Sequence, residues 1–256
     1  MSQPSRFSRF TRTLLLAGVA ALALSACASN RGQLGGSDYA ALTAGQSQAS
    51  LAELTERYRR NPRDRAIVIQ YAGVLRASGQ PQQASAALEQ AMLAHPGDMA
   101  ISIAYAKALT AAGRFEQSLT VIDNVLRPDA PDWNALLVKG ATLDQMGQHD
   151  QARHIYTQAA VIAPGQASIE TNLGLSYAMT NDLGRAEQHL RRAIQMRGAS
   201  PQTRQNLALV VGLQGRFNEA RALYAADLPA EQVGSNMAYI RALLTQQNRW
   251  DMIDKG

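Results

Sequence analysis

The side chains that most often do chemistry are few in this 256-residue sequence and do not gather in a known catalytic pattern. A single cysteine, Cys27, rules out an internal disulfide framework and any zinc site built on several cysteines. His149 and His154 are five residues apart, which places them on different sides of a helix turn rather than on one ligand face. We expect the four histidines, and carboxylates such as Asp144 and Asp150, to be solvated. The sequence therefore predicts no catalytic site, no metal site and no cofactor, and we expect the chain not to be an enzyme.

The first 26 residues have the pattern of an export signal. Arg6, Arg9 and Arg12 precede an apolar stretch, Leu14 to Leu24, which is too short to span a membrane as a helix. Without these three arginines, the chain carries 22 basic residues against 20 acidic ones. Most of the basic excess belongs to the signal, so we expect no nucleic-acid partner.

The stretch Leu24-Ser25-Ala26-Cys27 resembles the lipobox of bacterial lipoproteins, in which a leucine and two small residues precede the modified cysteine. The resemblance implies that residues 1–26 are a lipoprotein signal peptide and that Cys27 carries diacylglycerol and acyl chains such as palmitate. The alternative is an incidental or buried cysteine beside an ordinary cleavage site. Ala28, and not Asp, follows the cysteine. This resembles lipoproteins of the outer membrane, so we expect the inner leaflet of that membrane, facing the periplasm, rather than the inner membrane.

The segment after the cysteine lacks a sustained apolar periodicity. Residues 27–47 are rich in Gly, Ser, Gln and Ala. We therefore expect the lipidated Cys27 to be followed by a flexible tether with a reach of about 25 Å, which holds the folded part away from the lipid.

A constant spacing runs through the rest of the chain. A glycine or an asparagine recurs every 34 residues, at Gly79, Gly113, Gly147, Asn181 and Gly215. Both residue types readily adopt the left-handed conformation that ends a helix, so each position is expected to end the first helix of a pair. Asp132 and Ser200 are placed to cap the first helices that follow them. The repeat period predicts an array of helix pairs, and the low aromatic content of 5% favours an all-α fold.

The repeats resemble the tetratricopeptide repeat (TPR) family. In residues 167–200 the matching positions are Leu173-Gly174, Tyr177, Ala186, Leu190 and Ala193, although the tryptophan usual early in the first helix is absent. The resemblance implies an all-α solenoid of helix-turn-helix repeats. The period places five repeats in residues 65–234, namely 65–98, 99–132, 133–166, 167–200 and 201–234. A half-repeat helix is expected at 48–64, and a capping helix with a tail at 235–256.

By family geometry, an inner groove lined by the first helices would bind a peptide. Its expected lining residues are Ile69, Ile103, Lys107, Leu137, Asn172, Leu175, Asn206 and Leu209. The aliphatic members would anchor apolar side chains of the peptide, and the two asparagine amides would pair with its backbone. Two alternatives stay open. Ile69, Ile103 and Leu137 can be core residues covered by neighbouring repeats. Asparagine at the repeat position of Asn172 and Asn206 is also common in TPR sequences without a ligand.

The combination of lipobox and repeats resembles the TadD-type lipoproteins of tight-adherence (Tad/Flp) pilus systems. The resemblance implies a membrane-anchored protein–protein interaction adaptor that assists the assembly or localisation of the pilus secretin. The expected partners are a protein segment, from the secretin or another Tad component, and the membrane through the N-terminal lipid, with no small-molecule substrate. The alternative function is a general envelope scaffold that docks peptidoglycan hydrolases or outer-membrane protein assembly factors.

Overall fold

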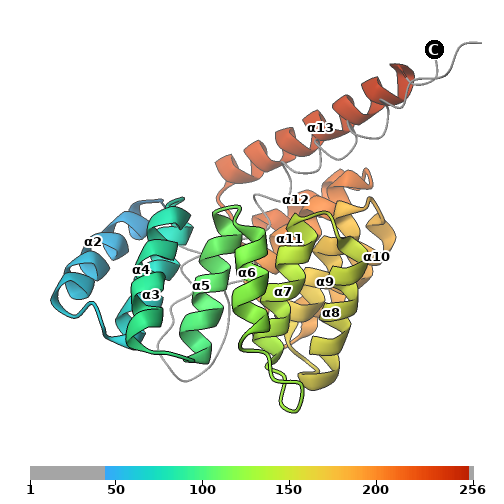
Figure 1. The fold of residues 1–256 in the computed structure, drawn as a ribbon. Helices are drawn as coiled ribbons and strands as arrows, with labels where there is room; N and C mark the ends of the chain where they lie inside the picture. Colours follow the sequence, from blue (N-terminus) through green and yellow to red (C-terminus); the bar gives the residue numbers. More distant parts are fainter. Residues whose placement is uncertain (1–43, 254–256) are drawn as a thin grey trace, which may run out of the picture. The chain divides into compact units, whose positions relative to one another are not determined.

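The fold consists of helices alone in the part of the chain that the structure describes. The structure, a computed structural model, describes the backbone of residues 44–253 and the side chains of residues 51–245. Residues 44–253 contain twelve α-helices and no strand. The helices are α2 (Ala44–Arg60), α3 (Arg65–Ala77), α4 (Pro81–Ala94), α5 (Met99–Ala111), α6 (Phe115–Asp123), α7 (Trp133–Gln145), α8 (His149–Ile162), α9 (Ala167–Met179), α10 (Leu183–Gln195), α11 (Pro201–Leu213), α12 (Phe217–Ala225) and α13 (Ala230–Ile253) (Figure 1).

The chain divides into two compact units, Met1–Pro164 and Gly165–Gly256. In the described part of the first unit, each helix from α2 to α8 packs on the next one along the chain. In the second unit, α9 to α12 pack in the same successive way, and α13 packs on both α11 and α12. The division falls two residues before the expected boundary between the third and fourth repeats, 133–166 and 167–200.

The turn inside each helix pair has the geometry that the repeat spacing predicts. Gly147 has a φ of 76°, and Asn181, at the same repeat position, has a φ of 61°. The residue after each of these turns donates its backbone N–H to a carbonyl five residues back, as Gln148 does to Leu143 O at 2.9 Å. This is the Schellman arrangement, which satisfies carbonyls that a helix end leaves unpaired.

Aspartate side chains begin the first helices of the three pairs in the first unit. Asp64, Asp98 and Asp132 accept hydrogen bonds from backbone N–H groups in the first turns of α3, α5 and α7. Ser200 caps α11 in the second unit. The expected caps at Asp132 and Ser200 are therefore confirmed, and each contributes about 1 kcal/mol to its helix.

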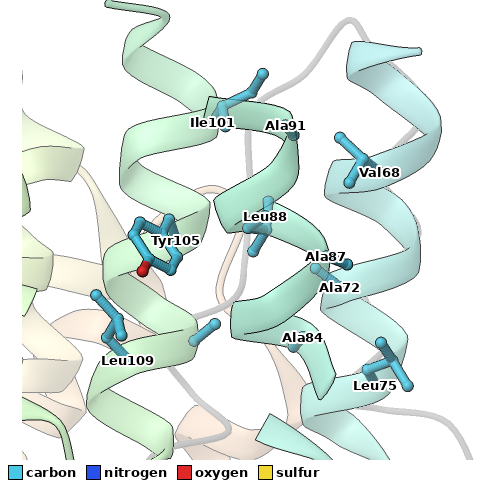
Figure 2. Packing of buried hydrophobic residues seen from close by; sticks show 11 residues of the cluster. Val68, Ala72, Leu75, Ala84, Ala87, Leu88, Ala91, Ile101, Tyr105 and Leu109 are labelled. Atoms are coloured by element: carbon cyan, nitrogen blue, oxygen red, sulfur yellow. The ribbon is translucent and has the colours of Figure 1, made fainter. Parts of the chain in front are cut away.

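Small residues on facing helices let the members of a pair approach closely. In the first core cluster, Ala72 of α3 and Ala84 of α4 are almost completely buried, and Leu88 fills the layer beside them. Tyr105 and Leu109 of α5 complete the cluster from the next pair (Figure 2). Because a helix is covered only when its neighbours are present, the pairs stabilise one another through nearest-neighbour contacts.

Two expected boundaries are wrong. Helix α2 begins at Ala44, inside the segment 27–47 that was expected to be a tether, because Ala and Gln residues there favour a helix. Helix α13 begins at Ala230, inside the expected repeat 201–234 and before the expected cap at 235–256. The carbonyl of Pro229 accepts from Val233 N at 3.1 Å, so the helix starts directly after this proline.

Candidate protein-interaction site

The expected groove residues of the first unit are mostly core residues. Ile103 and Leu137 are only 6% and 2% exposed. Ile103 packs with Ala135 and Val138 of α7. A side chain buried in this way cannot serve as an anchor for a peptide, so the expected groove contacts of Ile103 and Leu137 are corrected to core packing.

The other two expected groove residues of this unit are half-buried. Ile69 packs against the first core cluster, as the core alternative holds. Lys107 Nζ donates to Asn134 Oδ1 at 3.2 Å, from α5 to α7. Both side chains therefore have structural roles between neighbouring first helices.

The expected groove residues of the second unit lie on the two neighbouring first helices α9 and α11. The hydroxyls of Thr171 and Thr203, 3.1 Å apart, join these helices. Asn172 is 3% exposed and therefore belongs to the interior. Leu175, Asn206 and Leu209 are half-buried and keep part of their surface open, and Leu209 also packs against the core cluster of the second unit. These three residues are the part of the expected groove that a partner can reach.

Asn206 differs from its repeat equivalent Asn172 in one chemical respect. Its side-chain nitrogen Nδ2 is buried and has no hydrogen-bond partner in the described part of the chain. An amide N–H without an acceptor is costly when it is buried, by about 1–3 kcal/mol.

Two further half-buried residues, which were not among the predicted groove residues, extend this surface. Met179 and Leu213 are half-buried, one helical turn after Leu175 and Leu209. Residues four apart lie on one face of a helix, so this spacing was the signal that could have found them. We call the five residues Leu175, Met179, Asn206, Leu209 and Leu213 the α9–α11 face.

The charged side chains of α9 and α11 are engaged in ion pairs. Glu170 accepts from His189 Nδ1 at 2.8 Å and pairs with Arg192 at 3.1 Å, and these contacts lower the pKa of Glu170. Arg204 pairs with Asp227 at 2.5 Å. None of the five residues of the α9–α11 face is charged. The face therefore offers apolar contacts and one amide, and it suits an apolar segment.

The carboxylate of Asp144 is buried, so the expectation that it is solvated is wrong. Asp144 is 6% exposed and accepts a hydrogen bond from Tyr156 Oη at 2.9 Å. His149 Nδ1 lies 2.9 Å from its other oxygen. A buried carboxylate is tolerated when donors surround it, and these two donors come from the partner helix α8. The arrangement joins α7 to α8 within one repeat.

The described residues contain no group of three or more metal-ligating side chains that could hold an ion. None of their helices is both long enough and apolar enough to cross a membrane. Cys27, the expected signal peptide 1–26 and most of the expected tether lie outside the described residues.

Comparison with known proteins identifies the repeats. Two tetratricopeptide-repeat family models match adjoining segments of the chain, residues 75–140 and 137–202. These helix pairs are tetratricopeptide repeats. The expected fold class, an all-α solenoid of TPR repeats, is confirmed. TPR proteins are generally non-enzymatic scaffolds that bind other proteins, and the chain is a TPR protein–protein interaction adaptor.

Solved structures share the TPR fold at low sequence identity. A tetratricopeptide repeat protein from Parabacteroides merdae is 13% identical, with a TM-score of 0.63, over 94% of this chain and 86% of that one. PilW, described as a widely conserved type IV pilus biogenesis factor, is 16% identical, with a TM-score of 0.54, over 79% of this chain and 91% of PilW. Human IFIT1 is 14% identical, with a TM-score of 0.56, over 71% of this chain. The match covers only 46% of IFIT1. Among curated protein sequences, none matches this chain.

Proposed function

We propose that this TPR protein is a lipid-anchored adaptor of the bacterial envelope that assists the assembly or localisation of the Tad/Flp pilus secretion machinery, with a pilotin-like role toward the secretin. The observation that carries the proposal is the order of two features: a lipobox-like Cys27, then TPR helix pairs from residue 65 on. A lipid at Cys27 would place the adaptor at the outer membrane, facing the periplasm. The similarity of its fold to PilW, a pilus biogenesis factor, agrees with a role in pilus assembly.

The α9–α11 face is the surface that would hold the partner segment. Leu175 and Leu209 would receive apolar side chains of the partner, because they stay half-buried while most of the other predicted anchors are core residues. The amide of Asn206 would bind a backbone carbonyl of the segment after the side chain turns outward, because its Nδ2 is buried in the free protein. The absence of charge on these five residues favours an apolar rather than an acidic segment.

The lipid anchor would act by raising the local concentration of the adaptor and not by adding contacts to the partner. Two or more acyl chains hold a protein stably on a bilayer, whereas one chain is marginal. Confinement to the membrane raises the effective concentration of the adaptor near a membrane-bound partner. Loss of the lipid should therefore reduce function even when the TPR fold and its binding face are intact.

A deletion strain tests the pilus role. Secretin multimers should fall in the strain that lacks this protein and should recover with the wild-type chain but not with Cys27→Ser. Labelling with radioactive palmitate should mark the wild type alone. Normal multimers and normal pili in the deletion strain would reject the pilus role, and a labelled Cys27→Ser chain would reject the anchor.

Partner capture tests the α9–α11 face. The chain from residue 28 on serves as bait in an envelope extract, with Leu175→Glu and Leu209→Glu as the test variants. Each should reduce secretin capture at least tenfold while helicity is retained. Ala222→Glu, at an exposed position of α12, is the matched control and should capture as the wild type does. Specific capture of a peptidoglycan hydrolase or an outer-membrane assembly factor instead would favour the general envelope scaffold.

A further inference from the structure

Exposed aliphatic side chains gather at one end of the first unit. The described residues have four exposed large hydrophobic side chains, and three of them are Leu93 at 75%, Val161 at 79% and Ile162 at 41%. Leu93 and Val161 occupy the same repeat position, two periods apart, in the last turns of α4 and α8. Successive helices of the unit run in opposite directions, so α2, α4, α6 and α8 all end at the same end of the unit (Figure 1).

Arginines lie at that same end. Arg57, Arg59 and Arg60 are in the last turn of α2, and Arg63 follows in the turn to α3. The ring of His95, directly after α4, donates from Nε2 to the carbonyl of Arg63 at 2.7 Å. This contact places the turn that carries Arg63 beside the end of the helix that carries Leu93.

Two of these arginines have no acidic partner among residues 51–245. Arg59 pairs with Glu56 at 2.7 Å, and Arg57 lies 3.8 Å from Glu53. The side chains of Arg60 and Arg63 are exposed and form no ion pair with any residue between 51 and 245.

The aspartates at this end are engaged within the fold. Asp64, Asp98 and Asp132 cap helix N-termini, and Asp129 pairs with Arg127 at 2.7 Å. Arg60 and Arg63 are therefore the basic side chains at this end that lack an ion pair with residues 51–245. Asp64 keeps its negative charge as a cap, where the dipole of α3 offsets part of it, and the exposed Glu89 lies one turn before Leu93 on α4.

We infer that this end of the first unit, formed by Arg60, Arg63, Leu93, Val161 and Ile162, contacts the surface of an anionic lipid bilayer. A guanidinium binds phosphate oxygens through two parallel hydrogen bonds, and each arginine near an anionic bilayer strengthens binding about fivefold. Aliphatic side chains beside the arginines can enter the boundary between headgroups and acyl chains. A protein partner would require one contiguous apolar patch, whereas a bilayer accepts side chains that project separately from α4 and α8.

The length of the chain before α2 is consistent with this placement, which rests on the proposed anchor at Cys27. Helix α2 has 17 residues and is about 25 Å long, and its C-terminal turn is at the lipid-contacting end. Residues 28–43 connect the anchor to its other end. Sixteen residues can span at most about 55 Å when fully extended, which exceeds the length of α2 and allows its far end to return to the bilayer.

Vesicle binding tests the inference without the lipid anchor. The chain from residue 27 on, with Cys27→Ser, is mixed with phosphatidylcholine vesicles that either contain phosphatidylglycerol as a quarter of their lipid or lack it. We expect at least tenfold tighter binding to the anionic vesicles in about 50 mM salt, and a large loss of this preference in about 500 mM salt. Arg60→Ser with Arg63→Ser should weaken anionic binding about tenfold or more, and Leu93→Ser with Val161→Ser should weaken it by a similar factor.

Matched variants in the second unit show whether the end itself is responsible. Arg197→Ser with Arg221→Ser removes the same charge from exposed positions, and Tyr239→Ser removes the fourth exposed hydrophobic side chain. These controls should change binding twofold or less, with unchanged circular dichroism in every variant. Equal losses in the test and control variants would overturn the inference, because net charge alone would then explain the binding.

The failure of the anchor and the failure of this inference give different results. A chain that carries no acyl group in cells but prefers anionic vesicles would reject the anchor and support the lipid-contacting end. A lipidated chain whose unlipidated form ignores anionic vesicles would overturn the inference and leave the anchor standing. The inference would also be overturned by a wild type that does not bind vesicles but captures an acidic protein from lipid-free extract. In that case, Arg60→Ser with Arg63→Ser would abolish the capture.

Discussion

Gly174 of α9 lies directly against Leu190 of α10. A Cβ atom placed on Gly174 would be 2.7 Å from Leu190 Cγ and 3.0 Å from the backbone oxygen of Ala186. Real Cβ atoms do not approach other atoms so closely, and a backbone oxygen cannot turn aside as a side chain can. The close packing of the two helices in the fourth TPR repeat therefore depends on the missing side chain.

Gly174→Ala should destabilise the second unit although alanine is the better helix former. We expect a loss of about 1–3 kcal/mol from overpacking, which exceeds the gain of about 1 kcal/mol in helix propensity. Urea unfolding followed by circular dichroism measures the change. Gly184→Ala is the matched control, because a Cβ at this exposed position of α10 would have no neighbour closer than 4.0 Å. It should leave stability unchanged or raise it by about 0.5 kcal/mol; equal effects of the two variants would contradict the packing explanation.

Ile103 should behave as a core residue and not as a binding residue. Ile103→Ala leaves a cavity in the first unit and should cost about 2–5 kcal/mol. Leu93→Ala, at a position that is 75% exposed in the same unit, should change stability by less than about 0.5 kcal/mol. Thermal unfolding followed by the fluorescence of Trp133, with Trp250→Phe in both proteins, reports on this unit. An Ile103→Ala protein that stays stable but no longer binds its partner would show that Ile103 belongs to the binding surface.

The hydroxyl of Tyr156 should stabilise the third repeat through Asp144. Tyr156→Phe removes one of the two side-chain donors described for a buried carboxylate, and we expect a loss of about 1.5–3 kcal/mol. Tyr224→Phe is the comparison, since Tyr224 is also buried but its hydroxyl forms no hydrogen bond with the described residues. Because no hydrogen bond is lost, that change should cost less than about 0.5 kcal/mol. Similar losses in chemical denaturation would show that the Tyr156 hydrogen bond contributes little.

Glu187 should make the second unit sensitive to acid. Hydrogen bonds from Arg216, and then from Arg191 and Gln214, lower the pKa of Glu187 to about 2 from its ordinary 4.5. Because the pKa is lower in the folded state, the stabilisation is complete above about pH 4.5 and is lost as the pH falls toward 2. Glu187→Gln should be less stable than the wild type at pH 6, and the difference should shrink by pH 2.5.

Glu53→Gln provides the control for this pH dependence. Glu53 is 72% exposed and lies 3.8 Å from Arg57, so its ion pair should contribute little at any pH. Unfolding free energies at pH 6 and pH 2.5 compare the two variants. A Glu187→Gln protein whose stability follows the wild type at both pH values would show that the Arg216 and Arg191 contacts do not stabilise the fold.

The sequence predicts the helix pairs well because each turn is coded locally. A left-handed residue such as Gly147 and a capping residue such as Asp132 act on neighbouring backbone groups, and both have the predicted roles. The start of α13 is less well predicted, because the repeat length suggests 235 while Pro229 permits a helix from Ala230. Local signals therefore predict the helices correctly, whereas the repeat length alone misplaces the start of α13.

The candidate site is harder to predict because burial depends on the neighbouring repeat. Ile103 and Leu175 are both aliphatic residues of first helices, yet Ile103 is covered and Leu175 keeps open surface. The burial of Asp144 also depends on donors from another helix, Tyr156 and His149 of α8. No single-helix pattern distinguishes these cases, since the deciding atoms come from side chains on other helices.

The turns inside the helix pairs of the first unit have open space around them. A Cβ placed on Gly79, Gly113 or Gly147 would have no atom within 4 Å. These turns are at the opposite end of the unit from Leu93 and Val161, since they join each first helix to its second. An epitope or a fluorescent reporter inserted after Gly113 would therefore lie away from the lipid-contacting end of this unit and would mark the protein in living cells without covering that end.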